Sequence, residues 1–215
     1  MAARLGILLS GRGSNFLALQ GAIARGELPA EIVLLASDRP EAPGLERARE
    51  LGLPAVALPP REAPDRAAHE ARLRDALAAA GAEWVCLAGY MRVLSPAFLA
   101  AWRHRVLNIH PSLLPAFPGR DAQRQALEHG VKVSGCTVHL VDEGVDSGPI
   151  VIQRAVPVLE GDTVETLAAR ILEQEHQAYP EALRRLLLEP WRVEGRRVIF
   201  GPLAGPEISP GARQL

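Results

Sequence analysis

The stretch LGILLSGRGSNFLALQGAIARG, residues 5–26, decides the fold class. It begins with a short apolar run (5–9), continues through a glycine-rich turn (10–15) and ends in a helical pattern closed by Gly26. This order predicts a buried strand that leads directly into a helix. Such a strand–turn–helix segment is typical of the opening of a βαβ unit, in which the strands pair in parallel.

The same alternation continues through the first half of the chain. Strand-like apolar runs recur with helical patterns between them: the runs lie at 31–37, 54–58, 84–89 and 105–109, and the helical patterns at 44–52, 66–81 and 96–103. Ser95 and Pro96 open the last of these helices as an N-cap and a first-turn proline. Strands that alternate with helices predict a parallel, Rossmann-like sheet with right-handed crossovers.

A different pattern begins after Gly119. A short helix ends at Gly130, and two long runs of alternating apolar and polar residues follow at 132–141 and 149–158. Only seven residues, DEGVDSG, separate the two runs. A connection this short predicts an antiparallel hairpin.

A long helix and a small hairpin complete the predicted elements. Asp162 is the expected start of the helix, with Glu165 as its capping-box partner, and the helix runs to about Leu188. The second hairpin is expected around Gly195. The predicted fold class is therefore α/β, with a mostly parallel sheet, a Rossmann-like N-terminal half, antiparallel strands added in the C-terminal third, and helices on both faces.

The chain is expected to form a single domain. Its 215 residues are 48% hydrophobic, which is enough to bury a core. Residues 1–200 form the expected domain, with halves 1–104 and 105–200, and contain no low-complexity linker. The segment 201–215 is rich in glycine and proline and is expected to be a loose tail.

Charge and composition argue against several classes of partner. The net charge is −1, so there is no electrostatic case for nucleic acid or an anionic membrane. The N-terminal apolar run is shorter than that of a signal peptide, and no later run is long enough to span a bilayer, so a cytoplasmic protein is expected.

Cys86 and Cys136 lie in apolar runs and are expected to be buried free thiols, with a disulfide or a catalytic thiol as alternatives.

The glycine-rich turn SGRGSN (10–15) is a candidate site for one phosphate group. Ligands of open parallel sheets bind beyond the carboxyl ends of the strands, where a helix N-terminus offers N–H groups and partial positive charge. Gly11 and Gly13 allow close approach of the backbone, and Ser14 and Asn15 add side-chain hydrogen bonds. The turn lacks the motifs of dinucleotide and nucleoside-triphosphate sites, and a plain strand-to-helix turn is the alternative.

The stretch LNIHPSLLPAFPG (107–119) is the strongest catalytic candidate. Its three prolines fix the backbone after a strand. Asn108 and His110 lie two residues apart on that strand, so their side chains point to the same side. An amide and an imidazole that converge suit a carbonyl whose oxygen becomes negative in a transition state, although a buried structural pair is the alternative.

Two further loops leave their roles open. DEGVDSG (142–148) holds three carboxylates, and one of them could stabilise a charged His110, but a solvated acidic turn is the default interpretation. The apolar loop in LAGYMRVLSPAFL (87–99) could line a pocket for a flat aromatic ligand or pack in the core.

Glu175 and the other histidines are interpreted as structural or solvent-exposed residues. Glu175 is expected on a solvated helical face. The other histidines have no metal-ligand spacing and no assigned role, so no metal site is expected; His69, His104 and His129 are placed on or near helix surfaces, His139 in a strand and His176 in the long helix.

These stretches together resemble the folate-dependent phosphoribosylglycinamide formyltransferases of purine synthesis. The motifs SGRGSN, LAGYMRVLSPAFL, NIHPSLLPAFPG, GVDSGPIV and QEHQAYP occur in the order found in that family, over residues 4 to about 200. The resemblance implies that an amine of glycinamide ribonucleotide attacks the formyl carbon of 10-formyltetrahydrofolate, which acts as co-substrate. The expected partners are these small molecules, without nucleic acid, membrane or metal, and a monomer or a homodimer is expected.

The same resemblance implies roles for individual residues. Asn108 and His110 match the pair that stabilises the tetrahedral oxyanion, and Asp146 matches the catalytic aspartate that holds His110 charged. The substrate contacts implied are Gly13, Ser14 and Asn15 for the ribonucleotide phosphate, Glu175 for the ribonucleotide, and Met91, Arg92, Val93, Leu94, Val141, Asp142 and Asp146 for the folate.

One departure from the family pattern and several alternatives remain. After Pro118-Gly119 the family usually has an LHTH-like stretch, whereas this chain has Arg120-Asp121-Ala122-Gln123. A formyltetrahydrofolate hydrolase is expected to carry an additional N-terminal regulatory domain, and a methionyl-tRNA formyltransferase a basic nucleic-acid-binding domain. A formyltransferase for another amine, or a non-catalytic phosphate or folate binding module, is a further alternative.

Overall fold

The computed structural model describes residues 2–202, which divide along the chain into two compact units, the first ending at Asn108 and the second beginning at Ile109. The expected loose tail lies outside the described residues from position 203 onward. No helix in residues 2–202 is long and apolar enough to cross a membrane.

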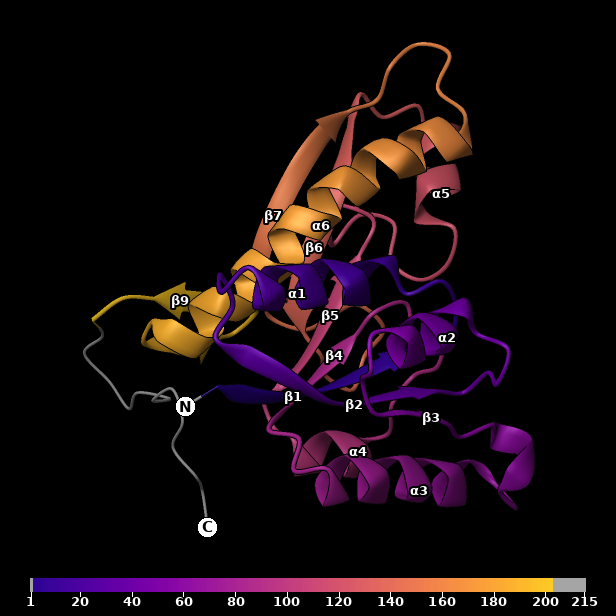
Figure 1. The fold of residues 1–215 in the computed structure, drawn as a ribbon. Helices are drawn as coiled ribbons and strands as arrows, with labels where there is room; N and C mark the ends of the chain where they lie inside the picture. Colours follow the sequence, from indigo (N-terminus) through magenta and orange to yellow (C-terminus); the bar gives the residue numbers. More distant parts are fainter. Residues whose placement is uncertain (1, 203–215) are drawn as a thin grey trace. The chain divides into compact units, whose positions relative to one another are not determined.

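The first unit is built on parallel strands in the order β3-β2-β1-β4-β5. The strands are β1 (Ala3–Leu9), β2 (Ala30–Ser37), β3 (Ala55–Ala57), β4 (Trp84–Leu87) and β5 (Val106–His110). In Figure 1, one face of these strands carries α1 (Ser14–Ala24) and α2 (Pro43–Glu50), and the other carries α3 (Arg66–Ala79) and α4 (Pro96–Ala101). The predicted Rossmann-like arrangement of this half is confirmed.

Burial on both faces explains the continuous apolar runs of these strands. Leu5, Ile7 and Leu8 of β1 are fully buried, as expected for a parallel strand covered by helices on both sides. Ser95 caps α4 by accepting a hydrogen bond from the Phe98 N–H, as the sequence predicts.

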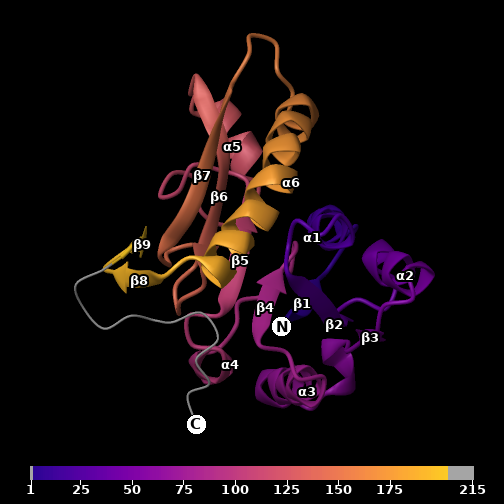
Figure 2. The same ribbon diagram turned by 60° about the vertical axis from the view of Figure 1, so that its left-hand side comes forward.

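The second unit is built on a long antiparallel hairpin. Strands β6 (Val133–Leu140) and β7 (Ile150–Pro157) pair in antiparallel fashion, and α5 (Ala122–Glu128) precedes them. Figure 2 shows α6 (Val164–Leu188) running along these two strands. The small hairpin of β8 (Trp191–Glu194) and β9 (Arg197–Phe200) follows, and β9 joins β7 in parallel. Both predicted hairpins are confirmed.

The predicted start of the long helix is wrong by one residue. The N-cap of α6 is Thr163, whose hydroxyl accepts from the Thr166 N–H while the Thr166 hydroxyl accepts from the Thr163 N–H. Asp162 instead accepts a hydrogen bond from the Leu159 N–H at 2.7 Å and forms a bidentate ion pair with Arg170. Asp162 therefore stabilises the loop before the helix, and Thr163, one residue later, accepts a hydrogen bond from a backbone N–H of the first turn.

His69 also differs from its predicted surface position. Its side chain is buried, and its Nε2 lies 2.8 Å from the carbonyl oxygen of Leu58. Helical periodicity identifies α3 but does not show that this face of the helix packs on the strand end at Leu58.

Candidate active site

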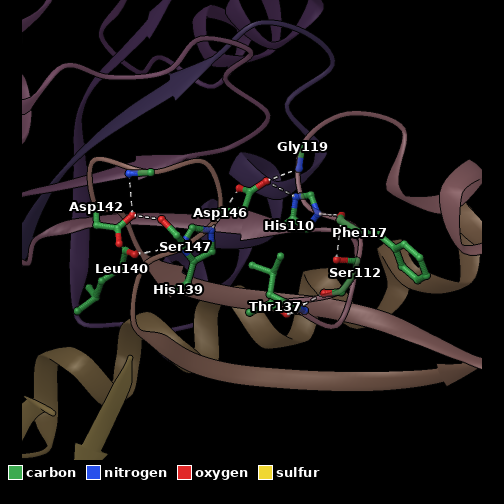
Figure 3. Close-up of polar contacts among 12 residues, drawn as sticks. His110, Ser112, Phe117, Gly119, Thr137, His139, Leu140, Asp142, Asp146 and Ser147 are labelled. Carbon is green, nitrogen blue, oxygen red and sulfur yellow. Dashed lines mark hydrogen bonds and ion pairs between the residues drawn. The ribbon is translucent and has the colours of Figure 1, made fainter. Parts of the chain in front are cut away.

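His110 stands at the end of β5 and is buried between two oxygen atoms (Figure 3). Its Nδ1 lies 3.2 Å from Oδ2 of Asp146, and its Nε2 lies 2.8 Å from the carbonyl oxygen of Phe117. Both neighbours are acceptors, and an imidazole donates from both nitrogens only when it is doubly protonated. The geometry therefore favours the imidazolium form of His110.

The backbone is strained at both residues that contact His110. Phe117 has φ of 54° and Asp146 has φ of 50°, in the left-handed region that residues other than glycine rarely occupy. The prolines on either side of this turn, at 115 and 118, restrict its alternatives. Strain of this kind persists where the surrounding structure holds it, and it is common at functional sites.

Asp146 has contacts on both carboxylate oxygens. The Gly119 N–H donates to Oδ2 at 2.8 Å, beside His110, and Nε2 of His139 lies 3.6 Å from Oδ1. The Asp146 side chain is only 13% exposed, so the interpretation of its loop as a solvated acidic turn is wrong at this residue. The sequence places these groups far apart, whereas the structure gathers them around one carboxylate.

His139 is a member of this cluster that the sequence interpretation missed. It is buried near the end of β6, at an irregularity in the β6–β7 register between Val138 and His139. Bulges of this kind re-aim side chains and are frequent near active sites. The available signal was the short hairpin connection, which keeps a residue at the end of its first strand close to the loop that contains Asp146.

Burial and charge act in opposite directions on the two central groups. Burial lowers the pKa of His110, while the charge of Asp146 and the Phe117 carbonyl partly offset that effect. For Asp146, burial acts to raise the pKa, but the contacts with His139, Gly119 and His110 outweigh it and hold the pKa below its ordinary value. Asp146 is thus an anion at neutral pH, whereas burial keeps the pKa of His110 below its ordinary value even though both of its neighbours are acceptors that favour the charged ring.

The loop that carries Asp146 is shaped by Asp142. Oδ1 of Asp142 accepts from the Ser147 hydroxyl at 2.6 Å and from the Gly144 N–H at 3.1 Å. A Cβ at Gly148 would lie 1.8 Å from the Leu140 carbonyl oxygen, so only glycine fits there. The implied folate contacts Val141 and Asp142 therefore belong to a preformed loop.

Asn108 and Glu175 complete the predicted residues of this part of the site. Asn108 is half-buried on β5, two positions before His110, so both side chains leave the same face of the strand. Glu175 is 6% exposed in α6, so its prediction on a solvated face is wrong. Burial and the negative charge of Glu175 raise the pKa of the Cys136 thiol to about 12. Cys136 and Cys86 are buried free thiols, as predicted.

In the first unit, the turn 10–15 is formed by backbone groups in close contact. Gly13 is the N-cap of α1 with φ of 73°, and a Cβ there would lie 2.9 Å from both Leu9 and Phe16. The Gly11 carbonyl accepts from the Gly44 N–H at 3.1 Å. Helix geometry leaves the first N–H groups of α1 without a carbonyl partner inside the helix, which suits an anion beside Ser14.

A second loop, 91–95, lies against this turn. The Met91 N–H donates to the Ser10 hydroxyl at 2.9 Å, and the Ser10 N–H donates to the Gly89 carbonyl at 3.0 Å. The side chains of Met91 and Val93 are about half exposed, whereas Leu94 is buried. The predicted phosphate turn and part of the implied folate loop are thus joined by hydrogen bonds.

Two residues of α3 hold the rest of the 91–95 loop. Arg66 donates to the Val93 carbonyl at 2.8 Å and to Glu70 at 2.9 Å, and Glu70 accepts from the Ser95 N–H at 3.1 Å. Burial acts to raise the pKa of Glu70, but the hydrogen bonds from Ser95 and Arg66 lower it below its ordinary value. No pattern in the sequence indicates that this helix supports the loop.

The stretch that departs from the family pattern forms the start of α5. Asp121 is the N-cap residue with φ of 57°, Ala122 is buried, and the Arg120 carbonyl accepts from Gln125 at 2.8 Å. Within residues 2–202, no group of three or more His, Cys, Asp or Glu side chains could hold a metal ion.

Comparison with known proteins assigns the family. The formyl transferase family model matches residues 3–183, so the chain belongs to the formyl transferase family. The mixed α/β fold agrees with that of glycinamide ribonucleotide transformylase 1 from Symbiobacterium toebii, with a TM-score of 0.91 and 54% identity over 93% of this chain and 94% of that one.

Individual relatives carry three kinds of name. Phosphoribosylglycinamide formyltransferase of Bacillus subtilis is 43% identical over 86% of this chain and 94% of its own length. The trifunctional purine biosynthetic protein adenosine-3 of Drosophila pseudoobscura pseudoobscura is 50% identical over 85% of this chain. The matched segment makes up only 14% of the length of that much longer relative. A formyltetrahydrofolate deformylase from Pseudomonas syringae has a TM-score of 0.85 at 27% identity, with 66% of its length covered.

Proposed function

We propose that the protein transfers the formyl group of 10-formyltetrahydrofolate to the amine of glycinamide ribonucleotide, as a phosphoribosylglycinamide formyltransferase of purine biosynthesis. The observation that carries this proposal is the pair of His110, buried at the end of β5, and Asp146, largely buried in the loop between β6 and β7. It occurs in a chain that matches bacterial proteins of that name over nearly their whole length.

The roles of the central residues follow from charge. When an amine attacks a formyl carbon, negative charge develops on the formyl oxygen. The amide of Asn108 and the positive charge of the His110 imidazolium stabilise this oxyanion, while Asp146 stabilises the imidazolium and accepts a proton from the attacking amine. His110 then supplies a proton to the departing folate nitrogen.

The hydrogen bond on Nε2 of His110 gives the two ring nitrogens different roles in proton transfer. Because Nε2 donates to the Phe117 carbonyl, its proton stays in place and Nδ1 is the nitrogen that gains and loses one. Nδ1 is also the nitrogen beside Asp146. Proton transfer therefore requires no rotation of the ring.

Substrate binding is assigned to the loops described above. Gly13, Ser14 and Asn15 bind the ribonucleotide phosphate, and Glu175 contacts the ribonucleotide. The folate contacts are Met91, Arg92, Val93, Leu94, Val141, Asp142 and Asp146. Residues 1–200 act as one formyltransferase domain, its half 1–104 for phosphate and its half 105–200 for catalysis and folate, in a cytoplasmic monomer or homodimer that needs no metal.

Folate ultraviolet absorbance tests the proposal directly. Purified protein is mixed with 10-formyltetrahydrofolate, with and without glycinamide ribonucleotide. An absorbance change that requires the ribonucleotide is expected. A change without it would mean hydrolysis, the activity in the name of the Pseudomonas syringae relative. Folate binding without any change would favour a binding module or another acceptor amine.

A further inference from the structure

In the second unit, a cluster of hydrogen-bonded polar groups packs on the turn that follows His110. Two of its residues have no role assigned above. They are Thr137 of β6 and Gln153 of β7, which face each other across the antiparallel ladder. Thr137 is fully buried, while Gln153 is exposed. Both contact the turn 112–117, which follows His110 in the chain.

The hydroxyl of Thr137 uses all of its hydrogen-bonding capacity on this cluster. It donates to the Ser112 carbonyl at 2.7 Å and accepts from the Leu114 N–H at 3.0 Å and from Nε2 of Gln153 at 3.0 Å. A hydroxyl has one donor and two acceptor positions, so none remains. Nε2 of Gln153 also donates to the Leu114 carbonyl at 2.8 Å. Three backbone groups of the turn are therefore held by two side chains.

The same turn presents the carbonyl that holds His110. The hydroxyl of Ser112 donates to the Ala116 carbonyl at 2.5 Å and lies 3.3 Å from that of Phe117. The Phe117 carbonyl in turn accepts from Nε2 of His110 at 2.8 Å. A continuous series of hydrogen bonds thus leads from Gln153 and Thr137 through the turn to the catalytic ring. Figure 3 shows the part of this series from Thr137 through Ser112 and Phe117 to His110.

We infer that Thr137 and Gln153 are positioning residues, which hold the turn so that the Phe117 carbonyl keeps the proton of His110 on Nε2. They touch no reacting atom. Their effect on turnover rests on the proposed function, but their effect on the ring of His110 does not. Without them, Nε2 loses a fixed acceptor, and the tautomer and orientation of the ring become mixed.

Two substitutions remove the cluster, and two others serve as controls. Thr137→Val keeps the shape of the side chain and deletes the hydroxyl, and Gln153→Met deletes the amide at an exposed position. Thr137→Ser restores the hydroxyl. Ser134→Ala is a matched control, since Ser134 is also buried in β6 but its hydroxyl has no hydrogen-bond partner among the described residues.

The first measurement is the ¹⁵N and ¹H NMR spectrum of His110 against pH, without substrates. Wild type, Thr137→Ser and Ser134→Ala should show a proton fixed on Nε2. Thr137→Val and Gln153→Met should show mixed tautomers and a lower pKa of His110, because the Phe117 carbonyl acts to raise that pKa. The kcat of these two variants should fall about tenfold to a hundredfold, as for small misplacements of a catalytic group, with little change in either KM.

Either of two results would overturn the inference. One is a wild-type ring spectrum and kcat in both Thr137→Val and Gln153→Met. The other is a loss of kcat with an unchanged ring spectrum, which would make the residues merely structural. Absence of formyl transfer in wild type as well would contradict the proposed function, and the ring spectra would still decide the role of the cluster.

Discussion

The turn 10–15 in the first unit and the His110–Asp146 pair in the second are built by different means. The turn consists of backbone groups, and its shape depends on the left-handed Gly13 and on the close packing of Gly11 against Gly44. The pair consists of buried ionisable side chains, held by hydrogen bonds from a proline-rich turn and from a hairpin loop.

This difference matches the two tasks. An anion can be bound by N–H groups and helix partial charge, which need only the correct backbone path. Proton transfer needs a side chain with a set orientation and a perturbed pKa, which requires burial and charged neighbours. Substitutions in the turn should therefore change binding, and substitutions at the pair should change turnover.

The largest effect is expected at the pair itself. Asp146→Asn and His110→Ala should each lower kcat by about a hundredfold or more, in line with the loss of a general acid–base or oxyanion group. Asn tolerates the left-handed backbone at 146, so the loop should persist. Asp121→Asn is the matched control, because Asp121 has φ of 57° but lies on the surface. Near-normal kcat in either site variant would contradict the assigned roles.

The pH dependence of His110 gives the next test. Burial lowers its pKa, and the charge of Asp146 opposes that shift. Removing the charge in Asp146→Asn should therefore lower the pKa of His110 further. The ring should lose its proton at a lower pH than in wild type, as followed by NMR titration. An unchanged or higher pKa in the variant would mean that Asp146 does not stabilise the imidazolium.

Changes in the turn should raise KM for the ribonucleotide and leave kcat largely unchanged. About a tenfold rise is expected for Ser14→Ala, which loses one hydrogen bond to a charged group. Gly13→Ala should also lower the free energy of unfolding by about 1–2 kcal/mol or more, because φ is positive and the new methyl group would meet Leu9 and Phe16.

Gly52→Ala separates strain from binding in this test. Gly52 has φ of 69°, and a Cβ there would contact nothing within 4 Å. This control should lose stability and keep its KM for the ribonucleotide. A KM that rises equally in Gly52→Ala and Gly13→Ala would show that the turn acts through global stability alone.

A smaller effect is expected at the support of the 91–95 loop. Glu70→Gln weakens the bonds to Arg66 and Ser95 and should raise KM for 10-formyltetrahydrofolate a few-fold, with kcat and the KM for the ribonucleotide unchanged. Glu50→Gln, which weakens only an exposed pair with Arg47, is the control. The measurement is steady-state kinetics with each substrate varied in turn. An equal rise in KM for both substrates would argue against a loop that is specific to folate.

The smallest effect should be on stability alone. Asp162→Asn should lower the Tm at neutral pH, because the hydrogen bonds from Arg170 and the Leu159 N–H hold the pKa of Asp162 well below its ordinary value. A depressed carboxyl pKa stabilises the fold above the pKa of the unfolded state, and this stabilisation is lost as the pH falls through the folded value. The Tm difference should therefore shrink in acid, and a constant difference would point to packing instead.

The sequence by itself determined the order and type of the elements. The apolar runs and glycine turns identified the parallel strands, and the short DEGVDSG connection identified the antiparallel hairpin. These features are local, since strand and helix periodicity and turn chemistry act over a few residues. The spacing of the residues paired Asn108 with His110, and the resemblance to the family added Asp146 to this candidate site.

Only the tertiary structure decided which side chains surround His110 and Asp146. Thr137 and Gln153 reach this region through contacts with a turn about 20 to 40 positions away in the chain, and His139 reaches Asp146 through the hairpin that β6 and β7 form. The burial of Glu175 and His69 likewise depends on which helix face meets its neighbours. Hydrogen bonds and burial are set by distance in space, and periodicity along the chain carries no information about such distant partners.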